Sequence, residues 1–436
     1  MKNYNFNLIP VIKADGSAEY EFIEKLKKRN EEVSDNVIKS VTEIIKDVRI
    51  NGDGAIKEYT KRFDGVDSDN FEISSDRIKE GFEHSLIKES LLKAAKNISE
   101  YHEKQKQSGY VYTKEKGVCI GQRVRGLHKV GIYVPGGTAA YPSSVLMNCI
   151  PAKLAGVKEI IMVTPPSKNG GVNDDILAAA YIAGVDRVFA VGGAQAVAGL
   201  AYGTKQLPKV DKIVGPGNIY VATAKRLLYG TVDIDMIAGP SEIMVIADEY
   251  ADPSYLAADL MSQAEHDLLA SCVLLCYSED KAQNVINEIQ KQLKTLSRSE
   301  IIKKALYDFS AIIICKDKEK AVEISNTVAP EHLELMVGNP FDYLNDIENA
   351  GSVFLGSFAP EPLGDYFAGP NHVLPSSGTA RFFSPLSVDS FIKKSSFIYY
   401  TKEALSGVKD DIIKIADAEG LTAHANSIKV RFEKNE

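Results

Sequence analysis

The sequence has no apolar run near the ~18 residues that a membrane-spanning helix needs, so we expect no membrane partner. It also has no basic cluster: 51 lysines and arginines are scattered among 59 acidic residues, for a net charge of −8. That distribution speaks against nucleic acid as a partner. The first residues, MKNYNFNLIPVIKADG, show neither a basic nor a continuous apolar segment, and we therefore expect no secretory signal.

Cysteine is also scarce. The chain has five cysteines, an odd number, and three of them lie in strand-like apolar runs such as CVLLC and AIIIC. Buried, reduced thiols in a cytosolic protein explain this pattern better than a disulfide framework does. We therefore expect a cytoplasmic protein.

The length of 436 residues exceeds that of one ordinary core and indicates two to four domains. The first 130 residues look mainly helical and charged. From there to residue 356, short apolar β-branched runs alternate with helical stretches, and the tail beyond residue 388 looks helical again. This alternation predicts α/β units with parallel, doubly wound sheets.

Four turns rich in glycine or proline follow expected strands: VPGG, TPP, GGAQ and GPGN. Ligands of doubly wound sheets bind at the carboxyl ends of the strands, and glycine lets backbone N–H groups approach phosphate closely. None of the turns is the G-x-G-x-x-G fingerprint. Two interpretations stay open here, a nucleotide site and tight turns that need positive φ.

The segment SQAEHD lies within residues 255–270, whose apolar spacing predicts one helix. Gln263 and His266 are three residues apart and would share a face of that helix. They could be metal ligands, or part of a solvated polar stripe.

The segment PEHLE places Glu331 beside His332 after a proline, at an expected helix start. They could be two separate acid–base groups, or Glu331 could be a carboxylate favoured by the helix dipole. The irregular stretch 362–382 carries Asp365 and His372, and a loop of this length with such residues indicates function. His84, His102 and His128 are expected at the solvated surface.

Eight segments spread in order over nearly the whole chain resemble histidinol dehydrogenases: YVPGG, GGAQAVAGLAYGT, VDKIVGPGN, AGPSE, SQAEHD, APEHLEL, PLGDYFAGPNHVLPSSGTARFFSPLSV and AEGLTAHANS. Many long blocks in one order are far more specific than a short motif. The resemblance implies an α/β fold of two Rossmann-like doubly wound domains plus small N- and C-terminal extensions, in a homodimer.

The resemblance also implies domain boundaries. We expect an N-terminal extension (1–26), a discontinuous first α/β domain with most zinc and catalytic residues (27–132 and 241–386), a second α/β domain with the NAD-binding turns (133–240), and a C-terminal helical appendage that docks on the partner subunit (387–436).

Members of this family oxidise L-histidinol through L-histidinaldehyde to L-histidine, the last step of histidine biosynthesis, with two NAD⁺ and one zinc ion per subunit. The resemblance implies that zinc holds the imidazole and amino group of the substrate, which positions the reacting carbon. His332 would then be the base for the alcohol and later for the hydrate, and Glu331 would activate the water that attacks the aldehyde.

The family's functional residues map onto this sequence without a departure at any of them. The implied zinc ligands are Gln263, His266, Asp365 and His424. The implied substrate contacts are Ser241, Gln263, His266, His332, Asp365, His372, Glu419 and His424. The implied cofactor contacts are Tyr133, Gln195 and Asn218.

Two other functions fit parts of the sequence. A zinc hydrolase would use the same ligands but leave the glycine-rich turns without a purpose, and a non-catalytic small-molecule binder would leave PEHLE without one. A third question is whether Cys149 forms a thiohemiacetal with the aldehyde. Its neighbours are apolar, with no basic residue within two positions to lower its pKa, so we expect a structural cysteine.

Overall fold

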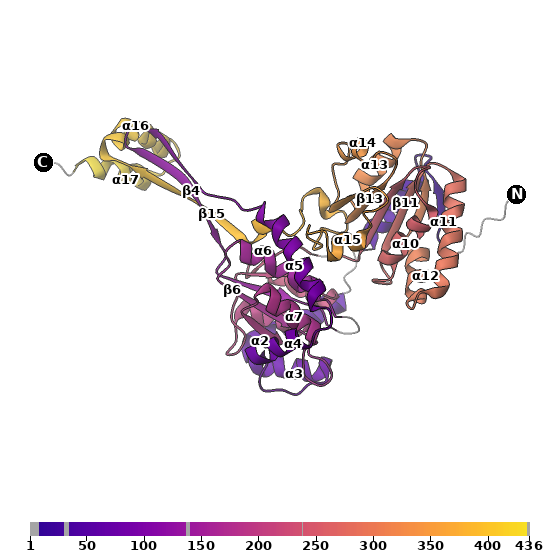
Figure 1. Ribbon diagram of the computed structural model, residues 1–436. Helices are drawn as coiled ribbons and strands as arrows, with labels where there is room; N and C mark the ends of the chain where they lie inside the picture. Colours follow the sequence, from indigo (N-terminus) through magenta and orange to yellow (C-terminus); the bar gives the residue numbers. More distant parts are fainter. Residues whose placement is uncertain (1–7, 30–34, 137–139, 238, 434–436) are drawn as a thin grey trace.

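The computed structural model describes residues 8–29, 35–136, 140–237 and 239–433. Figure 1 shows two α/β units side by side and a narrow arm that projects from one of them. We name the units after their central strands, the β10 unit and the β5 unit. No helix among the described ranges is long and apolar enough to cross a membrane.

The β10 unit is built on a six-stranded, wholly parallel sheet in the order β1-β12-β11-β10-β13-β14. Its strands are β1 (Val11–Lys13), β10 (Glu242–Ala247), β11 (Ser271–Cys276), β12 (Ala311–Ile314), β13 (His332–Met336) and β14 (Ser352–Leu355). Its helices are α1 (Ala18–Lys28), α10 (Pro253–Ala264), α11 (Glu279–Gln292), α12 (Ser299–Asp308), α13 (Lys318–Val328), α14 (Phe341–Leu344) and α15 (Glu361–Tyr366).

The β5 unit has a second six-stranded sheet in the order β2-β7-β6-β5-β8-β9, parallel except for β2. Its strands are β2 (Glu72–Ile73), β5 (Lys129–Tyr133), β6 (Glu159–Thr164), β7 (Arg187–Ala190), β8 (Lys212–Val214) and β9 (Asp233–Ile234). Its helices are α2 (Asp35–Asn51), α3 (Asp53–Asp64), α4 (Ser75–His84), α5 (Lys88–Glu103), α6 (Pro142–Leu154), α7 (Asp174–Ala183), α8 (Gly193–Tyr202) and α9 (Ile219–Leu228).

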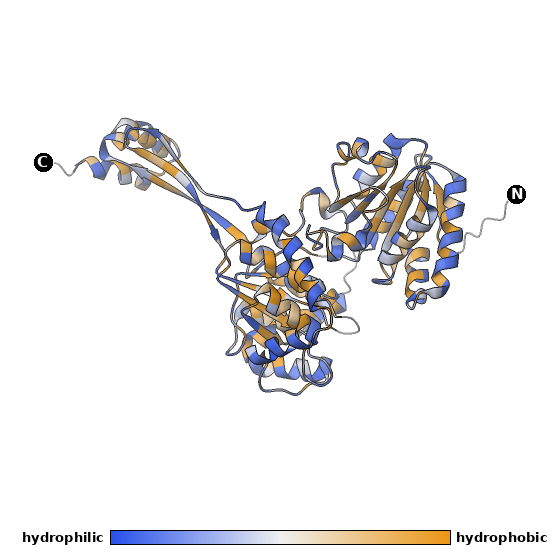
Figure 2. Ribbon diagram, viewed as in Figure 1, coloured by the Kyte–Doolittle hydropathy of each residue, from blue (hydrophilic) through white to orange (hydrophobic). Residues whose placement is uncertain are grey.

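Both sheets have the strand order of a doubly wound fold. If β10 or β5 is strand 1 and the later strands of its sheet are numbered in chain order, the spatial order in each sheet is 3-2-1-4-5. The remaining strand, β1 or β2, lies beyond strand 3. Helices cover both faces, so the strands are continuous apolar runs; every residue of β10 and β11 is buried. Figure 2 shows this pattern, with apolar strands inside and polar helix surfaces outside. The predicted fold class is confirmed.

The division of the chain differs from the predicted boundaries and corrects them. The N-terminal segment is not a separate extension, because β1 pairs with β12 and α1 packs on the β10 sheet. Residues 35–103 do not join residues 241–386. Their apolar faces, from Val41 to Ile98, are buried in the cores of the β5 unit instead.

The arm consists of an antiparallel sheet, β15-β4-β3, and two helices. Its elements are β3 (Tyr110–Glu115), β4 (Val118–Gly126), β15 (Ile392–Tyr400), α16 (Lys402–Ala418) and α17 (Thr422–Glu433). The tail was predicted to be helical from its start, but it begins with β15. The reason is a long-range pairing, in which all nine residues of β15 pair with β4.

Candidate active site

The predicted acid–base residues lie at the amino end of β13. His332 is the first residue of this strand, between Ile243 of β10 and Ser352 of β14, and Glu331 immediately precedes it. The predicted helix start is therefore wrong, because the apolar residues that follow His332 complete the buried sheet. Ligands of doubly wound sheets are expected at the carboxyl ends of the strands. The Glu331–His332 pair lies at the opposite edge of the sheet.

The ring of His332 is buried, and its two nitrogens have different surroundings. Nδ1 lies 3.0 Å from the carbonyl oxygen of Glu242, an acceptor, and therefore donates to it. Nε2 is buried without a hydrogen-bond partner among the described residues, 3.7 Å from Asp365 Oδ1. In a neutral ring, Nε2 then carries the free lone pair and is the atom that can accept a proton.

Glu331 is held next to this ring. Its Oε2 accepts a hydrogen bond of 2.9 Å from the backbone N–H of Glu242 and lies 3.7 Å from His332 Nδ1. Burial raises the pKa of Glu331 to about 7, although the neighbouring His332 opposes the shift. Burial would lower the pKa of His332, but the carboxylates of Glu331 and Asp365 outweigh it and raise this pKa to about 10.

Helix α10 brings Gln263 to the same edge. It runs back from the carboxyl end of β10 to the amino end of β11, so its last turn lies beside His332. Gln263 Nε2 is 3.4 Å from His332 Nδ1, while the buried Oε1 has no hydrogen-bond partner in the described ranges. The helix was predicted to continue to residue 270 but ends at Ala264, and His266 lies in the exposed turn that follows.

Three residues bring possible metal-ligand atoms within 4.8 Å of one another: His266, Glu361 and Asp365. Glu361 was not predicted, although its spacing of four residues from Asp365 on one short helix was a usable signal. It is buried and accepts a hydrogen bond of 3.2 Å from Ser262 Oγ. Burial and the charge of Asp365 raise the pKa of Glu361 to about 8.

Asp365 has the opposite shift. Burial alone would raise its pKa, but the neighbouring imidazole of His332 and the charge of His372 hold the pKa of Asp365 well below its usual range. Since a metal ion binds a carboxylate in its ionised form, this carboxyl is already in the state that coordination requires.

His372 and Ser241 flank this cluster. His372 Nδ1 donates to the carbonyl oxygen of Asp365 over 2.9 Å, and its Nε2 lies 3.5 Å from Ser144 Oγ on α6 of the β5 unit. The loop that carries His372 therefore connects the two units. Ser241 directly precedes β10, and its carbonyl oxygen accepts from the N–H of Ser271 over 3.0 Å.

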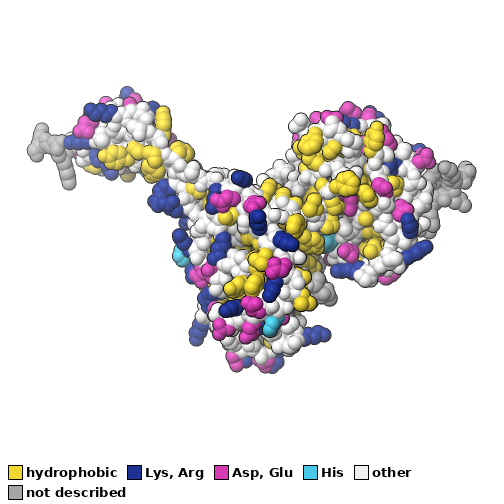
Figure 3. Space-filling view, viewed as in Figure 1, with side chains coloured by type: hydrophobic (Ala, Val, Ile, Leu, Met, Phe, Trp, Pro, Cys, Tyr) yellow, Lys and Arg dark blue, Asp and Glu magenta, His cyan; other side chains and the backbone are white. Residues whose placement is uncertain are grey.

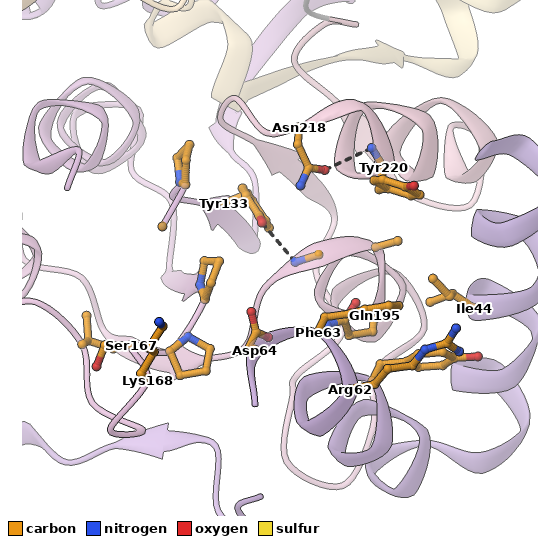
Figure 4. Close-up of a pocket in the computed structure, with 18 of the residues that line it drawn as sticks. Ile44, Arg62, Phe63, Asp64, Tyr133, Ser167, Lys168, Gln195, Asn218 and Tyr220 are labelled. Atoms are coloured by element: carbon orange, nitrogen blue, oxygen red, sulfur yellow. Dashed lines mark hydrogen bonds between the residues drawn. The ribbon is translucent and has the colours of Figure 1, made fainter. Parts of the chain in front are cut away.

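A cavity of about 1240 Å³ lies in the β5 unit, and all three predicted cofactor contacts line it (Figure 4). Tyr133, Gln195 and Asn218 follow or end strands β5, β7 and β8, at the carboxyl edge where ligands of doubly wound sheets bind. A nicotinamide dinucleotide suits a cavity of this size.

Polar groups of the cavity are available for a ligand. Both side-chain atoms of the buried Gln195 lack a hydrogen-bond partner among the described residues. The hydroxyl of Tyr133 accepts from the N–H of Gly193 over 3.0 Å, and burial raises the pKa of this tyrosine to about 12. Asn218 Oδ1 caps α9 by accepting from Tyr220 and Val221, which leaves the amide nitrogen as a donor.

The glycine of the GPGN turn is required by its backbone. Gly215 has φ +105°, and a Cβ there would lie 2.1 Å from the carbonyl oxygen of Tyr133. The tight-turn interpretation is therefore correct for this glycine, and the nucleotide interpretation of the turn is compatible with it.

Glu419 and His424 are not near the other predicted ligands. Both are exposed on the arm, Glu419 at the end of α16 and His424 in α17. Figure 1 shows these helices at the tip of the arm, far from α10 and α15 in the β10 unit. One chain therefore brings together Gln263, His266 and Asp365, but not His424.

The prediction for His102 is also wrong. This histidine was predicted at the surface but is fully buried, with Nδ1 donating to the carbonyl oxygen of Ile98 over 2.8 Å and Nε2 3.3 Å from Asn371 Nδ2. The loop containing Asn371 covers it, a contact across more than half of the chain. It is a packing residue beneath the loop that carries His372.

One doubly wound unit has a Glu–His pair beside side chains that could hold a metal ion, and the other has a large cavity at the carboxyl ends of its strands. Together they define the class: an α/β enzyme of the dehydrogenase type. The sequence model of the histidinol dehydrogenase family matches residues 27–432. The chain belongs to this family and is an oxidoreductase.

Individual relatives agree. A histidinol dehydrogenase from Clostridium acetobutylicum is 60% identical over 424 residues, covering 96% of this chain and 98% of its own. One from Bacillus cereus is 55% identical over 414 residues, covering 94% and 96%. The crystal structure of histidinol dehydrogenase from Elizabethkingia anophelis is similar with a TM-score of 0.89 at 39% identity, covering 95% of this chain and 96% of that one.

Proposed function

We propose that this protein oxidises L-histidinol through L-histidinaldehyde to L-histidine, the last step of histidine biosynthesis, with two molecules of NAD⁺. Family membership supports the substrate. The observation that carries the chemistry is the Glu331–His332 pair, in which Nε2 of the buried His332 ring lies beside Asp365 and has no hydrogen-bond partner among the described residues. The five cysteines are all free, which suits a cytoplasmic enzyme.

The residues at this edge fit a zinc ion. Gln263 Oε1 is a buried oxygen without a partner in the described ranges, and His266 and Asp365 offer nitrogen and carboxylate oxygen, the usual zinc ligands. A bound zinc ion would supply positive charge and coordination sites for the imidazole and amino group of the substrate. Such a charge would oppose the effect of Asp365 that raises the pKa of His332.

The first oxidation needs a base at the alcohol. His332 Nε2 takes the hydroxyl proton, while the carbonyl of Glu242 fixes the ring and its tautomer through Nδ1. Tyr133, Gln195 and Asn218 would hold NAD⁺, which would accept the two electrons of each oxidation.

The second oxidation begins with hydration. Glu331, held at Oε2 by the N–H of Glu242, takes a proton from the water whose oxygen adds to the aldehyde carbon. His332 returns the proton taken in the first oxidation to the aldehyde oxygen, which completes the hydrate. The neutral ring then takes a hydroxyl proton of the hydrate as the carbon is oxidised to the carboxylic acid. One base thus serves both oxidations, and the carboxylate acts in the hydration between them.

A second copy of the chain would complete the site. The arm exposes large apolar side chains, with Val111 67%, Ile398 75% and Ile415 62% exposed. Figure 3 shows apolar side chains gathered along the lower face of the arm. Exposed apolar surface of this kind is typical of an oligomer interface. We propose a homodimer in which Glu419 and His424 of one subunit reach the Gln263–His266–Asp365 cluster of the other.

Complementation tests the shared site. His332→Ala and His424→Ala chains, each inactive alone, are refolded together. In a mixed dimer one site collects both defects and the other has none, so activity returns to about one quarter of wild type if chains pair at random. If His424 served its own chain, every site would carry a defect and the mixture would be inactive.

The activity is tested by the appearance of reduced nicotinamide absorbance when wild-type protein, zinc, histidinol and NAD⁺ are mixed. His332→Ala, with the fold intact, should abolish it. A hydrolase or a simple binding protein would give no absorbance change with wild type, which would refute the proposal.

A further inference from the structure

A buried ion pair lies directly behind the catalytic pair. Arg29, which follows α1, has a side chain only 1% exposed. Its Nη2 is 2.5 Å from Glu242 Oε1, and its Nη1 donates to the carbonyl oxygen of Leu269 over 2.8 Å. Arg29 and Glu242 are 213 residues apart in sequence, and none of the motifs that identified the family includes Arg29.

Glu242 is also the residue whose backbone holds both proposed catalytic side chains. Its N–H donates to Glu331 Oε2 over 2.9 Å, and its carbonyl oxygen accepts from His332 Nδ1 over 3.0 Å. Because both groups belong to one residue, a rotation of its backbone would displace the carboxylate and the imidazole together. Glu242 is the first residue of β10, where the sheet constrains the backbone from one side only.

The side chain of Glu242 supplies the missing constraint. Oε1 binds Arg29, and Oε2 accepts from the backbone N–H of Ser377 over 3.1 Å. The carboxylate is thus held between the end of α1 and the loop that follows His372. Burial raises the pKa of Glu242, and Arg29 opposes this shift by stabilising the ionised form.

We propose that Arg29 and Glu242 are positioning residues of the dehydrogenase site: their buried ion pair fixes the backbone of residue 242, which sets the placement of Glu331 and His332. The inference rests on the catalytic roles proposed above. Stability alone does not account for the pair, because a buried ion pair is often no more stabilising than apolar side chains of the same size.

The chain offers a matched control. Lys320 and Glu19 form another buried ion pair in the same β10 unit, 3.3 Å apart and with side chains 13% and 0% exposed. The hydrogen bonds of Lys320 go to Tyr20 and Glu323, and within the described ranges no hydrogen bond or ion pair joins Lys320 to Glu242, Glu331 or His332. A variant at Lys320 therefore loses a comparable pair without disturbing the backbone of Glu242.

The test compares Arg29→Met, Arg29→Lys and Lys320→Met in the zinc-loaded enzyme, below the melting temperature of each. We expect Arg29→Met to lower kcat by about 10²-fold, the effect of a small misplacement of catalytic groups, with the KM for NAD⁺ unchanged. Arg29→Lys keeps a positive charge beside the carboxylate of Glu242 and should retain most of the wild-type kcat. Lys320→Met should lower the melting temperature and leave kcat unchanged.

Two results would overturn the inference: Arg29→Met with the kcat of wild type, or Lys320→Met with an equal loss. Should Arg29→Met not fold, Glu242→Gln removes the charge at constant size, and a wild-type kcat in that folded variant would be equally decisive. Failure of the proposed function is distinguishable, because wild type itself would then form no reduced nicotinamide from histidinol.

Discussion

The ion pair that holds the GPGN turn gives a prediction with a magnitude. Lys225 on α9 and Asp235 after β9 are hydrogen-bonded, with side chains 4% and 1% exposed. Lys225 Nζ also donates to the carbonyl oxygen of Gly215 over 3.0 Å, and Asp235 Oδ2 accepts from the N–H of the same glycine over 2.8 Å. The pair therefore fixes both backbone groups of the residue that begins the turn ending at Asn218.

Lys225→Met leaves the Asp235 carboxylate buried without its counter-charge. Breaking a buried pair from one side costs about 3–5 kcal/mol of folding free energy. Lys225→Met/Asp235→Asn removes the stranded charge, so the double variant should be more stable than Lys225→Met alone. Lys212–Asp233 is the control in the same unit; with Asp233 51% exposed, Lys212→Met should cost less than about 1 kcal/mol.

Urea unfolding of wild type, Lys225→Met, Lys225→Met/Asp235→Asn and Lys212→Met measures these free energies. The rate as a function of NAD⁺ concentration gives the KM for NAD⁺ of each folded variant, which reports on the turn. Lys225→Met should also raise the KM for NAD⁺, since Asn218 follows the released glycine by three residues. A loss below about 1 kcal/mol in Lys225→Met, or a double variant no more stable than the single one, would refute the reasoning.

Three further predictions follow from single side chains. Cys149 is fully buried and burial raises its pKa to about 12, so Cys149→Ala should keep most of the activity; a loss like that of His332→Ala would indicate a thiohemiacetal route. Asp365→Asn should weaken zinc binding by removing an anionic ligand, and an unchanged metal content in that variant would remove Asp365 from the site. Burial raises the pKa of Asp64 to about 6, so the folded state binds its proton more tightly and loses stability as pH rises from about 4 through 6. Asp64→Asn should thus stabilise the protein by about 1 kcal/mol above pH 7, after discounting for the partial exposure of the carboxyl, and not below pH 4; equal effects at both pH values would contradict this.

Much of the fold was predictable because the central strands are buried on both faces. Runs such as IMVIAD and CVLLC can be recognised as strands without knowing which strands they pair with. Their alternation with helices indicates parallel sheets. The strand at His332 was missed because its sequence, HLELM, carries a buried glutamate, Glu334, in place of an apolar residue. Glu334 breaks the continuous apolar run that marks a strand buried on both faces, and the preceding proline and glutamate resembled a helix start.

The arm could not be predicted from local pattern. Every residue of β3 is exposed and β15 is mostly exposed, so neither strand shows the alternation of a half-buried sheet. The pairing of β15 with β4 joins segments more than 250 residues apart. Most of the apolar side chains of β3 and β15 are exposed on the single chain.

The candidate site was predictable as a set of residues through the family resemblance, but not as an arrangement. Sequence spacing could place Gln263 near His266, yet it could not show that the helix ends between them, or that Glu361 joins Asp365. Nor could it pair Arg29 with Glu242, because a buried ion pair depends on tertiary packing and has no local signature.

Product analysis tests the central claim most directly. Purified protein with zinc is incubated with limiting L-histidinol and excess NAD⁺, and reduced nicotinamide and organic products are both measured after completion. The proposed function predicts two molecules of NADH for each histidinol consumed, with histidine as the product. One NADH for each histidinol, with the aldehyde as the product, would contradict the assignment of both oxidations to the Glu331–His332 pair.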